Sequence, residues 1–234
     1  MSEQVKPIRI IGIIGGTGKE GKGLAYRWLK AGFQILIGSR QAEKAHHVAA
    51  ELEEMIGTGA PVRGLGNSDA ALQADLVVLT VPYNAHRTTL ESIKSCLVGK
   101  ILVDVTVPLN PPKVTRVQMP PAGSAAQEAL EILGDNAQVA AAFQNISYEH
   151  LLQDEEVRCD VLVCGSSKLA RTITLELVRS AGLVGFDAGP IENSMVVEGL
   201  TSILIGINKQ FGLQSAGICI TGVPREATDL KNQD

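Results

Sequence analysis

A glycine-rich turn near the start of the chain has the residue spacing of a dinucleotide-binding site. Gly16, Gly18 and Gly21 form a G-x-G-x-x-G pattern, which follows an apolar run at residues 8–14 and precedes a segment with helical character. Side chains at these positions would block the approach of a pyrophosphate to the backbone N–H groups at the start of a helix. Because a strand is expected before the turn and a helix after it, the pattern indicates dinucleotide binding rather than an ordinary turn.

The end of the second apolar run indicates which dinucleotide is bound. A site for NAD usually carries a carboxylate at this corner, where it binds the ribose hydroxyls. This chain instead has Ser39 and Arg40, and Lys44 follows one helical turn later. A hydroxyl, a guanidinium and an ammonium group suit the 2′-phosphate of an adenosine ribose. We therefore predict that the cofactor is NADP.

Two later strand ends are candidates for the nicotinamide end of the site. Thr80 and Val81 precede Pro82 at the end of one expected strand, and Val107 precedes Pro108 just past the next. Ligands of open α/β sheets lie outside the carboxyl ends of the strands, so these residues are placed to line the site. Termination of a strand by proline explains the two prolines equally well, and the sequence leaves both interpretations open.

The sequence contains no recognisable acid–base pair beside a hydride acceptor. The long apolar segment at residues 191–208 reads as a helix and has no lysine. None of the four histidines has a carboxylate partner at a characteristic spacing; they are His46, His47, His86 and His150. We therefore assign no catalytic acid or base. A redox cofactor as second substrate, which accepts a hydride without a strong protein acid, fits this pattern.

Composition and charge narrow the class of protein. The 234 residues are 45% hydrophobic and 20% charged, as in globular proteins that bury a core. A net charge of −4 without a long basic run argues against nucleic acid as a partner. No apolar run reaches membrane-spanning length, so we expect a cytoplasmic protein without a membrane partner. The four cysteines lack metal-ligand spacing, and we expect reduced core thiols and no metal site.

Strand and helix patterns alternate along the chain, which predicts an α/β fold of the Rossmann type with a doubly wound, mainly parallel sheet. Strands are expected at residues 8–14, 34–37, 62–65, 75–81, 100–104, 138–143, 159–164 and 183–187. Helices are expected at residues 19–31, 41–55, 83–95, 125–133, 168–180 and 191–208. Residues 105–123 carry five prolines and read as a long surface loop.

The chain divides into two parts on this interpretation. Residues 1–188 form the NADP-binding domain with an extended sheet, and residues 189–234 form a small helical C-terminal part that closes the pocket of a second substrate. The helix expected at residues 191–208 is mostly apolar and hard to cover within so small a chain. Because large exposed apolar patches mark interfaces, we expect a homodimer.

Seven segments in a fixed order carry a resemblance to a known family. They are IGGTGKEGKGLAYRWLKAGFQILIGSR, LTVPYNAH, VDVTVPLNPP, VAAAFQNIS, DVLVCG, DAGPIENSMVVEGLTSILIGIN and GLQSAGICI. Together they resemble the F420-dependent NADP oxidoreductases (NADPH:F420 reductases) over nearly the whole chain. The opening alone fits several NADP-binding families, whereas its combination with DAGP and the VEGLT helix is more specific.

The resemblance implies direct hydride transfer between the nicotinamide C4 of NADP(H) and C5 of the deazaflavin coenzyme F420. It implies a pyrophosphate cradle made of Thr17, Gly18, Lys19 and Glu20, and a 2′-phosphate site made of Ser39, Arg40 and Lys44. It places three residues near the nicotinamide, namely Thr80, Val81 and Val107. The deazaflavin is expected against Asn145, Ile146, Tyr148, Ala216 and Gly217, with Tyr148 either a stacking partner or a plug.

Two alternatives remain open at this point. The first is an NADPH-dependent reductase of another acceptor on the same scaffold, such as an imine, a flavin or a metal chelate. The second is an NADP(H)-sensing regulator without turnover, which is compatible with the missing acid–base pair.

Overall fold

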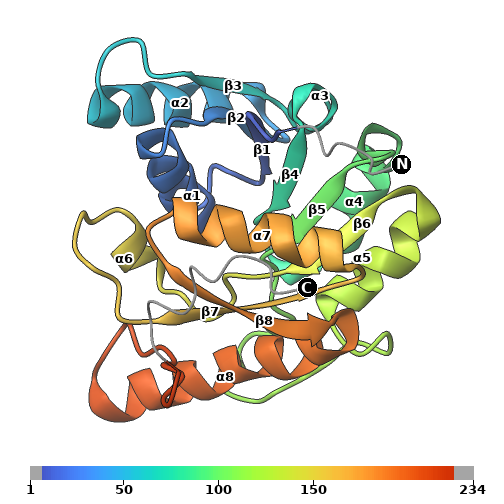
Figure 1. Cartoon of the computed structure of the whole chain (residues 1–234), viewed down its shortest axis with the longest axis vertical. Helices are drawn as coiled ribbons and strands as arrows, with labels where there is room; N and C mark the ends of the chain where they lie inside the picture. Colours follow the sequence, from blue (N-terminus) through green and yellow to red (C-terminus); the bar gives the residue numbers. More distant parts are fainter. Residues whose placement is uncertain (1–6, 224–234) are drawn as a thin grey trace.

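Eight strands form one sheet in the computed structural model, which describes residues 7–223 (Figure 1). The strands are β1 (Ile10–Ile14), β2 (Gln34–Ser39), β3 (Val62–Gly66), β4 (Leu76–Leu79), β5 (Ile101–Asp104), β6 (Gln138–Ala141), β7 (Asp160–Gly165) and β8 (Val184–Pro190). The helices are α1 (Lys19–Lys30), α2 (Ala42–Ile56), α3 (Asn67–Gln73), α4 (Tyr83–Ile93), α5 (Ala125–Leu133), α6 (Tyr148–Leu151), α7 (Lys168–Ser180) and α8 (Ser194–Phe211). Three short 3-10 turns complete the set, η1 (Lys94–Leu97), η2 (Gly134–Asn136) and η3 (Ile191–Asn193).

The strand order is β3-β2-β1-β4-β5-β6-β7-β8, and β1 to β6 all run parallel to one another. The chain winds outward from β1 to β3, returns to β4 on the other side of β1, and then winds outward again to β6. The direction of winding therefore reverses between β1 and β4, where ligands bind in open α/β sheets. The predicted doubly wound, mainly parallel α/β fold of the Rossmann type is confirmed.

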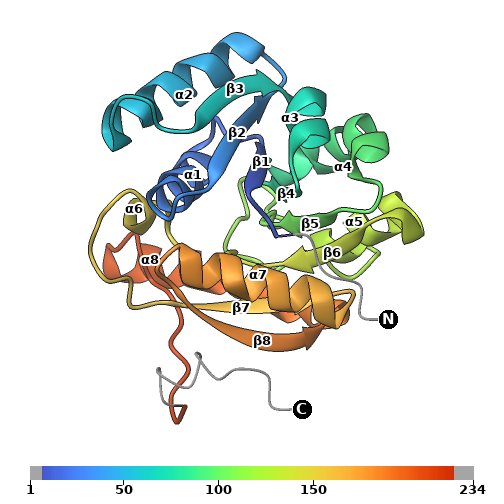
Figure 2. The ribbon, with the colours of Figure 1, turned by 45° about the horizontal axis from the view of Figure 1, so that its top comes forward.

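Helices cover both faces of the sheet, which explains the unbroken apolar runs of the strands (Figure 2). Ile11, Ile13 and Ile14 of β1 have no exposed surface. One apolar cluster joins the sheet to α1, α2 and α7, and a second joins the opposite face to α3, α4 and α5. Both clusters are mainly aliphatic, as the low aromatic content predicts, although the first also contains Tyr26, Trp28 and Phe143.

The last two strands depart from the parallel arrangement. Residues 142–159 connect β6 to β7 without a crossover helix, since α6 has only four residues. β7 consequently pairs antiparallel with β6, and α7 then returns the chain to place β8 parallel to β7. The amino end of β7 therefore lies at the same edge of the sheet as the carboxyl ends of β1, β4, β5 and β6.

The expected elements are present with shifted ends, and two helices were not expected. α3 and α6 occupy segments without an assigned structure, and the strand expected at residues 34–37 continues through Ser39. The expected C-terminal helix begins with η3 and extends to Phe211, so it contains the exposed Lys209. Residues 105–123 contain no helix or strand, as predicted. None of the helices in residues 7–223 is long and apolar enough to cross a bilayer.

The cysteines only partly follow the expectation of core thiols. No disulfide forms among them, and Cys159 and Cys164 are buried, but Cys96 is half-buried and Cys219 is exposed. Burial raises the pKa of the Cys164 thiol to about 11.

Trp28 of α1 contacts both α7 and the segment that follows β6. Its side chain is fully buried, and its Nε1–H donates a hydrogen bond to the Leu177 carbonyl of α7 at 2.9 Å. Its ring meets the edge of Phe143 with centroids 5.7 Å apart. α1 is thereby fixed against both α7 and the end of β6.

Candidate active site

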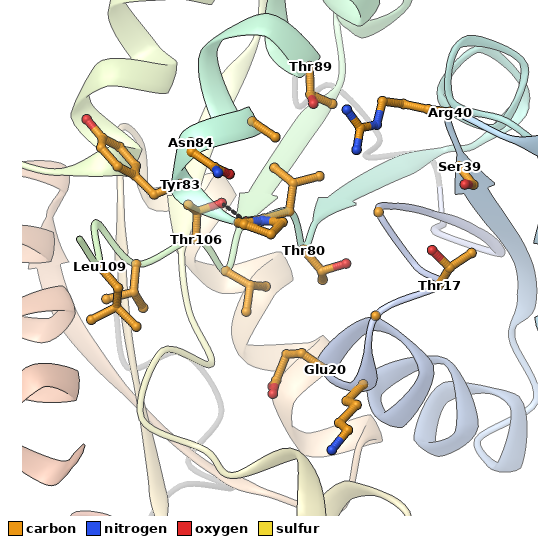
Figure 3. A pocket seen from close by; sticks show the side chains of 18 of the residues that line it. Thr17, Glu20, Ser39, Arg40, Thr80, Tyr83, Asn84, Thr89, Thr106 and Leu109 are labelled. Carbon is orange, nitrogen blue, oxygen red and sulfur yellow. Dashed lines mark hydrogen bonds between the residues drawn. The ribbon is translucent and has the colours of Figure 1, made fainter. Parts of the chain in front are cut away.

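A cavity of about 790 Å³ lies at the carboxyl ends of β1, β4 and β5, where the winding of the sheet reverses (Figure 3). Its wall begins at Gly15, whose φ of +76° lets the chain turn sharply out of β1. The turn is fixed by Gly15 N–H and Gly16 N–H, which both donate to the Gly38 carbonyl of β2. The site is therefore built on the rigid centre of the sheet.

The glycines of the turn have two different roles. Gly18 precedes α1, lines the cavity and provides no side-chain cap, so the first N–H groups of the helix remain available. Gly16 and Gly21 do not line the cavity: a Cβ on Gly16 would lie 2.8 Å from the Ile13 carbonyl oxygen, and one on Gly21 would lie 2.7 Å from Thr80 Oγ1. They let α1 pack against the strand ends, while the open helix start has the chemistry of a pyrophosphate cradle.

Polar and basic side chains gather at the end of β2. Ser39, Arg40 and Lys44 all line the cavity, together with Gln41 and Asn67, which the sequence did not indicate. Within residues 7–223 neither Arg40 nor Lys44 has an ion-pair partner, and Asn67 Oδ1 is buried without a hydrogen bond. Figure 3 shows the Arg40 guanidinium extending toward Thr89 of α4. Two unpaired cations beside a hydroxyl fit the 2′-phosphate that distinguishes NADP from NAD.

The middle of the cavity is formed by the segments after β4 and β5. Thr80, Val81 and Val107 line it, as do Thr106 and Leu109. Thr80 Oγ1–H donates to the Ile14 carbonyl at 3.1 Å, and Thr106 Oγ1–H donates to the Val81 carbonyl at 3.4 Å. Val81 and Val107 line the cavity beside these hydrogen bonds and form an apolar surface that suits a flat nicotinamide ring.

A second cavity of about 390 Å³ adjoins the first and is lined by the end of β6, α6 and α8. Asn145, Ile146, Tyr148 and Ala216 line it, from segments far apart in sequence. Gly217 does not line it, because it packs so closely on Cys159 that a Cβ would collide with the sulfur. Both cavities share four lining residues, namely Glu20, Val105, Val107 and Leu109.

Unpaired polar atoms indicate what the second cavity can bind. Asn145 Oδ1 and Gln144 Oε1 are buried and have no hydrogen-bond partner among the described residues. Phe143, also in the wall, has a φ of +72°, a conformation that is uncommon for residues other than glycine. The cavity therefore offers acceptors to N–H or O–H groups of a largely apolar ligand, which fits a polar-edged ring system such as a deazaflavin.

Lys19 and Tyr148 meet at the rim between the two cavities. Lys19 Nζ donates to the Tyr148 hydroxyl at 3.0 Å and lies 4.6 Å from the centre of its ring. The hydrogen bond raises the pKa of Lys19. This contact joins α1 to α6 and directs the Lys19 ammonium along the rim to Tyr148. The place in a pyrophosphate cradle that the resemblance implies for Lys19 stays a prediction.

A buried ionic network lies behind the cavity wall, and the sequence did not reveal it. His86 Nε2 lies 2.7 Å from Asp104 Oδ2, and neither side chain has exposed surface. Burial lowers the pKa of His86, but the attraction and hydrogen bond of Asp104 outweigh it and raise the pKa overall. His86 Nδ1 lies 3.8 Å from Glu128 Oε2, and the same carboxylate binds Tyr83 and Arg87.

The expectation that no histidine has a carboxylate partner is therefore wrong. His86 pairs with Asp104, and the exposed His47 lies 3.3 Å from Glu51. His86 lines neither cavity, so it acts through other residues: Asp104 Oδ1 accepts from Thr106 N–H and holds the segment after β5 in place. The expectation that the sequence contains no Tyr–Lys pair at the Y-x-x-x-K spacing is also wrong, because Tyr26 and Lys30 have this spacing. Both side chains bind Asp154 and line neither cavity, so they are not placed to act on a bound ligand.

Three features together are typical of a dinucleotide-binding oxidoreductase of the Rossmann class: the doubly wound sheet, the uncapped start of α1, and the basic corner formed by Ser39, Arg40 and Lys44. Residues 10–108 match the family model described as NADP oxidoreductase, coenzyme F420-dependent. The chain is 38% identical to the F420-dependent NADP reductase of Methanocaldococcus jannaschii over 91% of its own length and 98% of that protein. It is 40% identical to the F420-dependent NADP reductase of Methanothermobacter thermautotrophicus, over 92% and 96% of the two lengths. The chain belongs to the F420-dependent NADP reductase family.

A solved structure supports the fold independently. A candidate F420-dependent NADP reductase from Arthrobacter sp. FB24 superposes with a TM-score of 0.75, covering 92% of this chain and all of that one. The two sequences are only 23% identical, so this likeness speaks to the architecture.

Proposed function

We propose that this protein transfers a hydride directly between NADP(H) and the deazaflavin coenzyme F420, as its family membership suggests. The observation that supports this most strongly is the pair of adjoining cavities, which share Glu20, Val105, Val107 and Leu109. When bound, the nicotinamide supplies a hydride at C4 and the deazaflavin accepts it at C5. Cavities that share a wall let two flat rings lie face to face, so the protein contributes positioning and the exclusion of water.

The first cavity is the proposed NADP(H) site. The start of α1, with Thr17 and Gly18, holds the pyrophosphate, while Ser39, Arg40 and Lys44 hold the 2′-phosphate. Thr80, Val81 and Val107 hold the nicotinamide, and of these Val107 also lines the second cavity. Gly16 and Gly21 contribute indirectly, because their lack of side chains lets the start of α1 pack closely against the ends of the strands.

The second cavity is the proposed deazaflavin site. Asn145 and Ile146 contribute a polar edge and an apolar wall, and Ala216 closes the far side. Gly217 contributes by its closeness to Cys159, which places the Ala216 backbone. Tyr148, held by Lys19, serves as a side of the pocket rather than a plug, since the cavity remains open beside it.

We also propose a C-terminal part at residues 189–234 that closes the second cavity. Thr201, Leu204, Ile205 and Asn208 of α8 line that cavity, which supports this role. Residues 224–234 of the proposed part lie outside the described residues.

The decisive experiment is an anaerobic absorbance assay of NADPH with purified F420. Consumption of NADPH with matching loss of the deazaflavin absorbance supports the proposal. Parallel assays with FMN, a cyclic imine and a ferric chelate test the alternative acceptors. NADPH binding without turnover on any of the four would instead favour a sensor of NADP(H).

We propose that α8 also forms a homodimer interface. Its outer face carries five exposed apolar residues at helical spacing, namely Met195, Val196, Ile203, Ile207 and Phe211. Such a continuous apolar face fits a second copy packed about a two-fold axis. Sedimentation of the wild type and of Ile203→Glu tests this: the wild type should sediment as a dimer and the variant as a folded monomer. The cytoplasmic location stays a prediction.

A further inference from the structure

Glu20 is the one titratable side chain that lines both cavities in the part of the chain the structure describes. It is the second residue of α1, where its side chain leaves the glycine-rich turn. Figure 3 shows it pointing away from Ser39 and Arg40, toward the side of the site on which Thr106 and Leu109 lie. It is therefore directed along the junction of the cavities rather than toward the 2′-phosphate corner.

The surroundings of Glu20 make it an unusual member of a phosphate cradle. Its Oε1 atom is closed off from solvent and has no hydrogen-bond partner among residues 7–223. The residue is half-buried, and the burial of its carboxyl group raises its pKa to about 8, which favours the neutral acid near pH 7. An ionised carboxylate beside a pyrophosphate would repel it, whereas a neutral acid offers an O–H donor.

Among the residues that the structure describes, no ion pair offsets this burial. The other charged or titratable side chains at the two cavities face elsewhere or lie at other walls: the Lys19 ammonium is held by Tyr148, and the Tyr83 hydroxyl by Glu128. Arg40 follows β2, Lys44 lies in the first turn of α2, and Glu149 of α6 interacts with Tyr148. Burial is thus the cause of the raised pKa, and none of these groups replaces Glu20 as a proton donor at the junction.

We propose that Glu20 is the catalytic proton donor and acceptor for the deazaflavin, a role that rests on the proposed function. Reduction of the deazaflavin by NADPH moves a hydride, with its two electrons, from nicotinamide C4 to ring C5, and it also requires one proton on a ring nitrogen. The Glu20 carboxylic acid gives that proton, becomes a carboxylate, and regains a proton from water after release. In the reverse direction the Glu20 carboxylate removes the proton as NADP⁺ takes the hydride.

The test compares wild type with Glu20→Gln, which keeps the shape and neutrality of the protonated acid but cannot titrate. Glu43→Gln is the matched control, since Glu43 is an exposed first-turn glutamate of α2 that lines neither cavity. For wild type and control, kcat/KM for F420 reduction should fall about tenfold per pH unit above pH 8 relative to Glu20→Gln. At pH 7, Glu20→Gln should be slower by about 10²-fold. Titrations of the deazaflavin itself are common to all three proteins and cancel in the ratio.

A second measurement needs no deazaflavin. The oxidised nicotinamide ring is positively charged, so ionisation of Glu20 should favour NADP⁺ over NADPH. The affinity for NADP⁺ divided by the affinity for NADPH should rise about tenfold from pH 6.5 to 9.5 in wild type and stay constant in Glu20→Gln. A tenfold change is the size expected when an opposite charge lies within about 4–6 Å.

The two measurements separate the inference from the proposed function. An affinity ratio that stays flat in wild type, or a pH profile of Glu20→Gln that matches wild type, overturns the role of Glu20. Failure of wild type to reduce F420 at any pH overturns the proposed function. If the affinity ratio still rises with pH in that case, Glu20 lies near the nicotinamide but has no deazaflavin to protonate, and its proposed role is overturned as well.

Discussion

Replacement of His86 by alanine should strongly destabilise the protein without abolishing its chemistry. His86 and Asp104 have no exposed side-chain surface and lie 2.7 Å apart, and Glu128 lies close to the other ring nitrogen. Removing one partner of a buried pair leaves an uncompensated carboxylate, which costs about 3–5 kcal/mol. Because a domain of this size is stable by about 5–15 kcal/mol, His86→Ala should still fold in the absence of denaturant.

The pH dependence of this loss has a definite sign. The folded-state pKa of His86 is raised above its ordinary value of 6.5, so its charged-pair contribution is complete below pH 6.5. That contribution is lost as the pH rises through the raised folded-state pKa. The difference in unfolding free energy between wild type and His86→Ala should therefore be larger at pH 6 than at pH 9.

Urea unfolding followed by far-UV circular dichroism measures this difference. His46→Ala is the control, because His46 is exposed on α2 and its replacement should change stability by less than about 0.5 kcal/mol. Since His86 lines neither cavity, turnover of the folded variant should fall by less than the 10²-fold typical of a lost general acid. A destabilisation below about 1 kcal/mol, or one that grows with pH, would refute this account of the pair.

Three further changes probe the cofactor corner, the second cavity and a buried helix cap. Arg40→Ala should reduce the preference for NADPH over NADH by about 1.5–3 kcal/mol, measured by fluorescence titration; equal wild-type affinities would contradict the assignment. Ala216→Phe should block F420 reduction and leave NADPH affinity nearly unchanged; retained reduction would mean that the second cavity is misassigned. Glu198, fully buried, accepts hydrogen bonds from Ala125 and Ala126 N–H, and burial raises its pKa to about 8. The folded state therefore holds this proton more tightly than the unfolded chain does. Between pH 5 and pH 9 the free energy of unfolding of the wild type should fall by about 2–4 kcal/mol relative to that of Glu198→Gln; a constant difference would rule this out.

The fold was predictable because its signals are local. The central parallel strands β1, β2, β4, β5 and β6 are short, largely buried apolar runs, whereas β3 and β8 are only partly buried. Glycines and prolines mark several of the strand boundaries. α3 was missed because only Ala70 and Ala71 are buried in its seven residues, too few to give a helical period. The antiparallel pairing of β6 with β7 was not readable either, since it depends on how a connection without a crossover helix folds back.

The candidate site was predictable only where it is continuous in sequence. The glycine-rich turn and the basic corner each occupy a few neighbouring residues, and the structure gathers most of them around one cavity. His86 and Asp104 come from different elements, and nothing near either residue signals the other. The place of Glu20 between the two cavities depends on Val105, Val107 and Leu109, which line the same cavities from the segment after β5, so no local pattern could reveal it.

Trp28 gives the protein a built-in optical reporter. It is the chain's one tryptophan, so the indole emission of the folded protein arises at a single buried point. Its ring touches Phe143, which itself lines the second cavity. A ligand entering that cavity therefore comes within one aromatic ring of the fluorophore, and a deazaflavin would quench its emission by energy transfer. Binding of a deazaflavin can thus be followed in the unlabelled protein at a fixed concentration of NADP(H), whether or not any hydride is transferred.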